Sequence, residues 1–145
     1  MKKIIPFLLI LFFAMSSCKE DTVTTTEPAD EPIVIENLKL NEKTKWKANI
    51  ETTDGIREMQ KILSEFEETE KLKDYKKLAR KLNKVNKQIL KQCSMEGEAH
   101  NNLHAYLTPI FKYLKILKKT KSVPEAKKTV YNFKRHLKEY FEYFE

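Results

Sequence analysis

A short stretch near the middle of the chain gathers the side chains with the greatest capacity for chemistry. It reads Cys93-x-Met95-x4-His100-x3-His104. Residues four apart lie on the same face of a helix, so His100 and His104 are expected to be neighbours. Thiolate, thioether and imidazole groups are the ligands that Cu(I), Zn(II) and related soft or borderline ions prefer. The stretch therefore predicts a copper or zinc site formed by Cys93, Met95, His100 and His104.

Two more side chains of these types, Met59 and His136, would reach the same site in a four-helix bundle. In an up-down-up-down bundle the first and third helices start at the end where the fourth helix finishes. At a rise of about 1.5 Å per residue, His104 and His136 lie about 13 Å from that end and Met59 about 9 Å. Met59 and His136 are therefore secondary candidates for the metal site.

Two other interpretations of these residues stay open. Buried methionine and cysteine usually serve only for packing, and a histidine on a half-apolar helix face is more often hydrogen-bonded structure than a ligand. Met59 on the first helix and His136 on the last also resemble the axial haem ligands of b-type four-helix cytochromes. That layout leaves Cys93 without a role, so a copper or zinc ion is the expected cofactor and haem is not.

Composition and motifs argue against an enzyme. The chain of 145 residues holds only two glycines, Gly55 and Gly97, which cannot form a phosphate-binding loop or a dinucleotide-binding fingerprint. No HExxH, CxxC or CxxCH motif occurs, and the apolar stripes lack the glutamate and ExxH ligands of di-iron bundles. No spacing of serine, cysteine, histidine and acid marks a nucleophile. We therefore expect no catalytic residues.

The elements that would position the metal ligands are predicted to be helices. Apolar residues recur at helical spacing in four segments, which run from Ile56 to Phe66, from Tyr75 to Cys93, from His100 to Leu117 and from Ala126 to Phe144. Leu82 and Leu107 are expected in the core. Short connections between the segments predict an all-α, up-down-up-down four-helix bundle over residues 37–145, behind a lipidated, disordered tether.

The ends of the helices carry recognisable signals. Thr52, Thr53 and Asp54 are candidate N-caps for the first helix. Ser122, followed by Pro124, is typical of the start of the fourth helix, because proline fits the first turn of a helix.

An extended lead-in, residues 37–49, precedes the first helix. Its pattern is short and alternating rather than helical. We expect Leu38, Leu40 and Trp46 to pack against the bundle.

The first residues resemble a bacterial lipoprotein signal. Two lysines precede an apolar run, residues 4–15, which is too short to span a bilayer, and Ser-Ser then leads to Cys18. This ending resembles a lipobox, in which the cysteine is acylated and becomes the first residue after cleavage. The resemblance implies a signal peptide over residues 1–17 and a membrane anchor at Cys18; the alternative is an ordinary secretory signal. With Cys18 acylated, Cys93 is the only free thiol.

Residues 18–36 are predicted to be a tether, because residues 19–36 contain six acids, one lysine and two prolines without a helical period. Its start, Lys19-Glu20-Asp21, resembles the signal that sends lipoproteins of the Bacteroidetes to the outer face of the outer membrane. Together with the helical segments and the stretch from Cys93 to His104, the chain resembles small lipoproteins of the Bacteroidetes. The resemblance implies an outer-membrane lipoprotein, displayed on the surface or held in the periplasmic leaflet, and implies no activity.

The bundle segment is more basic than the whole chain. Residues 37–145 contain 25 lysines and arginines against 15 acids, a net charge of +10. Only three residues of the chain are arginine, so a nucleic-acid partner is not expected. The lysines are spread over all the helices, which is typical of a solvated surface; contact with anionic headgroups or polysaccharide is the alternative. Two functions stay open: a metal-binding surface lipoprotein, or a module that docks a protein or polysaccharide partner.

Overall fold

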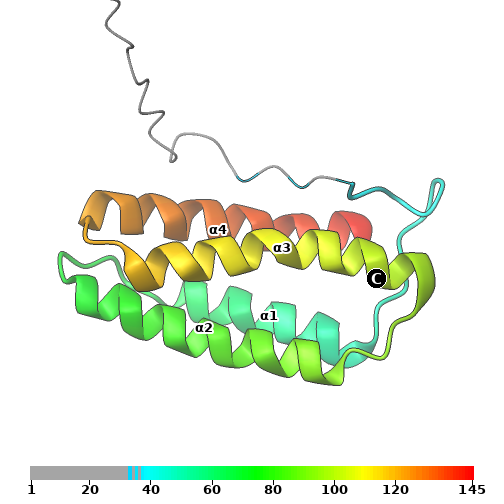
Figure 1. Cartoon of the computed structure of the whole chain (residues 1–145), viewed down its shortest axis with the longest axis horizontal. Coiled ribbons are helices and arrows are strands. Elements are labelled where there is room, and N and C mark those ends of the chain that lie inside the picture. Colours follow the sequence, from blue (N-terminus) through cyan, green and yellow to red (C-terminus); the bar gives the residue numbers. More distant parts are fainter. Residues whose placement is uncertain (1–32, 34, 36) are drawn as a thin grey trace, which may run out of the picture.

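Four antiparallel helices form the body of the protein. The computed structural model describes residues 33, 35 and 37–145 of the chain. The helices are α1 (Ile50–Ser64), α2 (Leu72–Gln92), α3 (Gly97–Lys119) and α4 (Val123–Tyr143). Each helix contacts the next along the chain, and α4 returns to α1, so the four close into a bundle (Figure 1). The described residues form no strand, and the predicted all-α four-helix bundle is confirmed.

One end of the bundle holds the starts of α1 and α3, the end of α2 and the end of α4 (Figure 1). The prediction that the six candidate metal ligands lie near one another assumed this arrangement. None of the described helices is both long enough and apolar enough to cross a membrane. The predicted signal peptide, Cys18 and all of the predicted tether except residues 33 and 35 lie outside the described residues.

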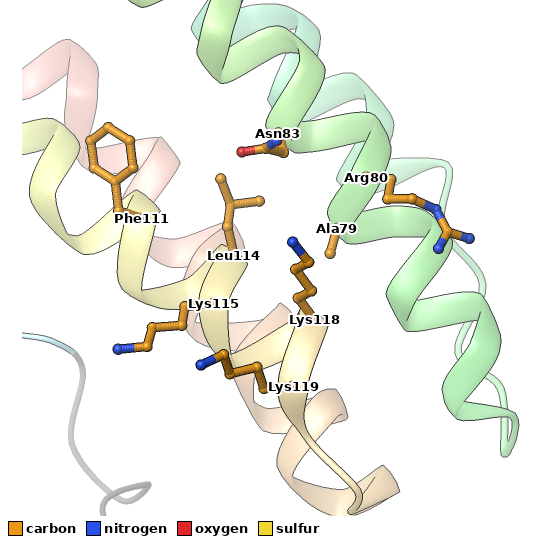
Figure 2. Close-up of a pocket in the computed structure, with 8 residues that line it drawn as sticks. All are labelled: Ala79, Arg80, Asn83, Phe111, Leu114, Lys115, Lys118 and Lys119. Atoms are coloured by element: carbon orange, nitrogen blue, oxygen red, sulfur yellow. The ribbon is translucent and has the colours of Figure 1, made fainter.

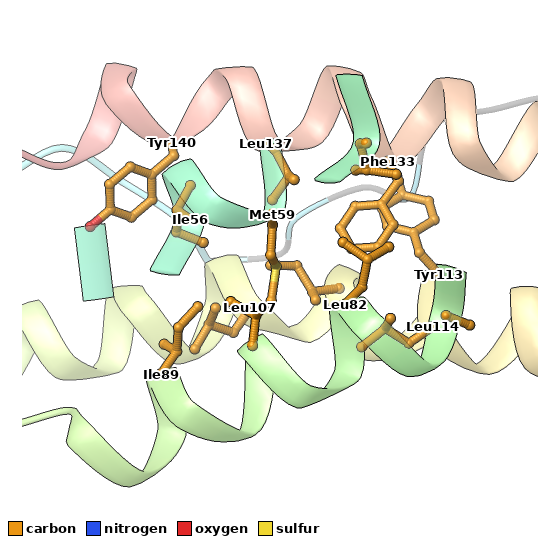
Figure 3. Close-up of a cluster of buried hydrophobic side chains, with 14 of the residues drawn as sticks. Ile56, Met59, Leu82, Ile89, Leu107, Tyr113, Leu114, Phe133, Leu137 and Tyr140 are labelled. Atoms are coloured by element: carbon orange, nitrogen blue, oxygen red, sulfur yellow. The ribbon is translucent and has the colours of Figure 1, made fainter. Parts of the chain in front are cut away.

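The core is a single hydrophobic cluster that draws on all four helices. Leu82 of α2 is fully buried and Leu107 of α3 is 2% exposed, as their helical spacing predicts. Met59 lies in the middle of this cluster, among Ile56, Leu82, Leu107 and Leu137 (Figure 3).

The start of α1 differs from the expectation. The helix begins at Ile50, so Thr52 and Thr53 lie inside it and Asn49 takes the N-cap position. Both threonines are buried and their hydroxyls have partners: Thr52 Oγ1 donates to Asn49 Oδ1 at 2.7 Å, and Thr53 Oγ1 lies 3.0 Å from the Tyr140 hydroxyl. The prediction that they cap the helix is wrong, because their hydroxyls bond to other side chains instead of free backbone N–H groups. At α4 the expected cap is present, since Ser122 accepts a hydrogen bond from the Glu125 amide.

The lead-in is joined to the end of α4. The Trp46 backbone N–H donates to the Tyr143 carbonyl at 2.7 Å, and the Glu145 amide donates to the Trp46 carbonyl at 2.9 Å. The Trp46 ring is buried, and its indole N–H donates to the Lys39 carbonyl. Leu40 is 41% exposed, so the prediction that it packs against the bundle is wrong for this residue.

Packing begins before the predicted start of the domain at residue 37. Ile33 and Ile35 are partly buried against the core, and the Ile33 amide donates to the Tyr113 hydroxyl at 3.4 Å.

Candidate metal centre

The loop between α2 and α3 sets the positions of the predicted ligands. α2 ends at Gln92, and the backbone is extended at Cys93. Gly97 starts α3 with φ of +61°, a left-handed conformation that glycine adopts without steric strain. This reversal returns the chain beside Cys93, and His100 lies one turn into α3.

Three of the predicted ligands come together at this loop. Cys93 Sγ lies 3.6 Å from His100 Nδ1, and His100 Nε2 lies 2.9 Å from His104 Nε2. The two imidazole rings meet edge to face with their centroids 4.4 Å apart. Cys93 and His100 are half-buried, whereas His104 is exposed. The spacing of the two histidines thus places them side by side, as predicted.

The two contacts use different nitrogens of His100, and this limits what the cluster can bind. An ion held between Cys93 and His100 lies on the Nδ1 side of the ring, whereas His104 faces Nε2. In the described part of the chain no three histidine, cysteine, aspartate or glutamate side chains are arranged to hold a metal ion together. The arrangement therefore offers a pair of ligands, Cys93 and His100, rather than the predicted larger set.

The spacing of this pair suits a metal ion. With Zn–S near 2.3 Å and Zn–N near 2.0–2.1 Å, two ligands of a tetrahedral zinc ion lie about 3.5 Å apart. The observed separation of Cys93 Sγ and His100 Nδ1 is 3.6 Å. If the hydrogen of the imidazole pair is on His100 Nε2 and is donated to His104, Nδ1 keeps its lone pair on the side of the thiol. A hydrogen bond to the second ring nitrogen is how metal-binding histidines are usually oriented.

The methionines are placed differently. Met59 is fully buried in the centre of the core, away from solvent. Met95 is half-buried and packs against the edge of the core, in the same loop as Cys93. The structure thus assigns Met59 a packing role and leaves Met95 near the ligand pair.

His136 is engaged elsewhere in the bundle. Its Nε2–H donates to the Tyr106 carbonyl at 2.9 Å, and the Tyr106 hydroxyl donates back to the His136 carbonyl at 3.0 Å. The rings of the two residues are stacked, with centroids 4.5 Å apart. Burial lowers the pKa of His136 to about 4, so the ring is neutral near pH 7. The structure therefore uses His136 to join α3 to α4.

Comparisons with protein-family models, with curated proteins and with solved structures gave no match for this chain.

A second feature was missed by sequence reasoning. A groove of about 370 Å³ lies between α2 and α3, and its lining includes Arg80, Lys118 and Phe111 (Figure 2). The sequence signal was present, because α2 carries eight lysines and arginines and only one acid, Asp74. Sequence alone did not show that this charge borders a groove with an aromatic side chain in it.

Proposed function

We propose that the protein is a lipid-anchored helical domain that binds a soft or borderline metal ion through Cys93 and His100. His104 holds the His100 ring in position. The observation that carries this proposal is the 3.6 Å separation of Cys93 Sγ and His100 Nδ1, which matches two ligands of one tetrahedral ion. The donor set, a thiolate and an imidazole, is the one that copper and zinc ions prefer.

Two protein ligands leave the remaining coordination positions to water, to Met95 or to an incoming donor. Closed structural zinc sites have four protein ligands and hold their metal permanently. A half-buried pair suits reversible uptake and transfer of an ion. This is a binding function without catalysis.

The proposed location is the outer membrane. Acylation of Cys18 would supply the anchor, because several buried acyl chains hold a protein on a bilayer essentially permanently. The lipobox and the Lys19-Glu20-Asp21 sequence support surface display.

The test is metal titration of the reduced chain from residue 19 onward, which keeps every described residue. Zn(II) and Cu(I) are titrated separately against a competing chelator. Cys93→Ser and His100→Ala are each expected to remove the site, and His104→Ala to weaken it by about 10–100-fold, the usual effect of losing a hydrogen-bond partner of a ligand. Asn101→Ala, an exposed change in the same turn of α3, is the matched control and keeps wild-type affinity. Met95→Leu removes the thioether, so the change in metal affinity of this variant measures how much Met95 contributes to binding.

Two further readouts identify the ligands. Co(II) in place of Zn(II) shows sulfur-to-metal charge-transfer absorption in the wild type and none in Cys93→Ser. Affinity falls as the pH is lowered, because thiol and imidazole must lose their protons to bind. Equal, weak uptake by the wild type and all variants would contradict the metal site and favour the module that docks a protein or polysaccharide partner.

A further inference from the structure

The surface of α2 and the second half of α3 carries 12 of the 25 lysines and arginines of residues 37–145 and only one of their 15 acids. α2 contains eight lysines and arginines against one acid, and α3 contains four lysines after Phe111 and no acid there. All of these cations except Lys76 are exposed. The bundle therefore has a strongly electropositive side.

The groove between α2 and α3 lies within this side. Ala79 and Leu114 line it between the two helices, and the Lys118 amine lies between the helices, pointing toward Asn83 (Figure 2). Arg80 borders the groove on α2, and Lys115 and Lys119 border it on α3. We call Arg80, Lys115, Lys118 and Lys119 the groove cations.

Among the described residues, the groove cations have no carboxylate partner: none of the four lies within ion-pair distance of a carboxylate. Four positive charges around a volume of about 370 Å³ repel one another, so an anion that enters the groove lowers their electrostatic energy. The groove is suited to a phosphate group.

A second cationic groove provides a contrast within the same bundle. It lies between α1 and α4 and is lined by Arg57, Lys61, Lys134 and Lys138. There Arg57 pairs with Asp54 at 2.9 Å and Lys61 pairs with Glu65 at 3.9 Å, so half of its charge already has a partner. None of the described residues that line it is aromatic, whereas Phe111 lines the α2–α3 groove and is 45% exposed.

We propose that the α2–α3 groove binds the phosphate of an anionic lipid headgroup. The groove cations would hold the phosphate, and Phe111 would contact the apolar part of the lipid beside it. A free phosphate ion would leave this exposed ring in water, whereas a membrane surface offers negative charge next to apolar groups. An anchor at Cys18 would allow the contact, because the 14 residues 19–32, which precede the packed Ile33, span at most about 50 Å when extended.

The experiment measures binding of the chain from residue 19 onward, without any acyl anchor, to vesicles by co-sedimentation. Vesicles of phosphatidylglycerol with phosphatidylcholine are compared with vesicles of phosphatidylcholine alone. The wild type is expected to bind only the anionic vesicles. Metal ions are absent, so failure of this proposal is distinguishable from failure of the metal site.

Charge-reversal variants locate the binding site. Arg80→Glu with Lys118→Glu is expected to reduce the partition coefficient by about 30-fold or more, since each cation near an anionic surface contributes about fivefold. Lys61→Glu with Lys138→Glu, which changes the net charge equally in the α1–α4 groove, is expected to reduce it less than about threefold. Phe111→Ala, which leaves the charge unchanged, is expected to weaken binding by about fivefold through lost apolar contact. Circular dichroism of each variant confirms that it is folded.

Three results would overturn the proposal. Equal losses in the two charge-reversal variants would show attraction by net charge alone. Abolition of vesicle binding by millimolar inorganic phosphate, at constant ionic strength, would identify free phosphate as the ligand. Binding to dextran sulfate without binding to anionic vesicles would identify a sulfated polysaccharide instead.

Discussion

The buried histidine between α3 and α4 makes the stability of the bundle depend on pH. His136 is 3% exposed, and burial lowers its pKa from the ordinary 6.5 to about 4. In the unfolded chain the same imidazole binds a proton below pH 6.5, whereas in the folded chain it stays neutral until about pH 4. Lowering the pH therefore stabilises the unfolded state, and the free energy of unfolding falls between pH 6.5 and about 4.

The size of the effect follows from the two pKa values. Each pKa unit corresponds to about 1.4 kcal/mol, so the full loss is about 3 kcal/mol. A domain of this size has a free energy of unfolding of about 5–15 kcal/mol, so the loss is a large part of the total. Below pH 4 both states are protonated at this site and its contribution no longer changes.

The assay is urea unfolding followed by far-UV circular dichroism, from pH 7.5 down to pH near 4. The variant His136→Gln has no titrating group at this position, so its free energy of unfolding is expected to fall by about 3 kcal/mol less than that of the wild type over this range. Comparing the two proteins cancels the contribution of the carboxylates. Tyr106→Phe is the control: it removes the hydroxyl that donates to His136, costs about 1 kcal/mol and keeps the wild-type pH dependence. The same pH dependence in the wild type and His136→Gln would show that His136 does not have a lowered pKa in the folded protein.

Three further predictions concern the anchor and the packing. Cys18→Ala is expected to move the protein from the membrane fraction to the soluble fraction; a variant that stays with membranes after a high-salt wash would contradict lipidation at this residue. Leu82→Ala and Leu107→Ala should each lower the free energy of unfolding by about 2–5 kcal/mol in urea melts, because both side chains are buried in the core. Gly55→Ala should destabilise by about 1–3 kcal/mol although alanine favours helices, since an added Cβ would lie 2.4 Å from Ile89 Cγ1. Combining Gly55→Ala with Ile89→Ala should cost less than the sum of the two single changes; full additivity would show that the two positions do not clash.

Features of this protein that depend on neighbours along the chain could be predicted from its sequence. The helical spacing of apolar residues predicted four helices, and their short connections predicted the bundle that the structure confirms. The contact of Cys93, His100 and His104 also spans few residues, since it needs only one loop and one helical turn. The lipoprotein signal depends on sequence alone, and it stays a prediction because Cys18 lies outside the described residues.

The rotation of each helix about its own axis depends on packing between helices, which the sequence did not reveal. The position of a residue along a helix axis follows from its number, and on this basis Met59 and His136 were predicted to lie near the metal ligands. Each residue turns a helix by about 100°, and small differences in rotation decide whether a side chain faces the core, a neighbouring helix or water. Packing turned Met59 into the core and His136 toward Tyr106. The same rotations brought cations and Phe111 from two helices into one groove, because burying the apolar stripes leaves only the remaining faces to meet solvent.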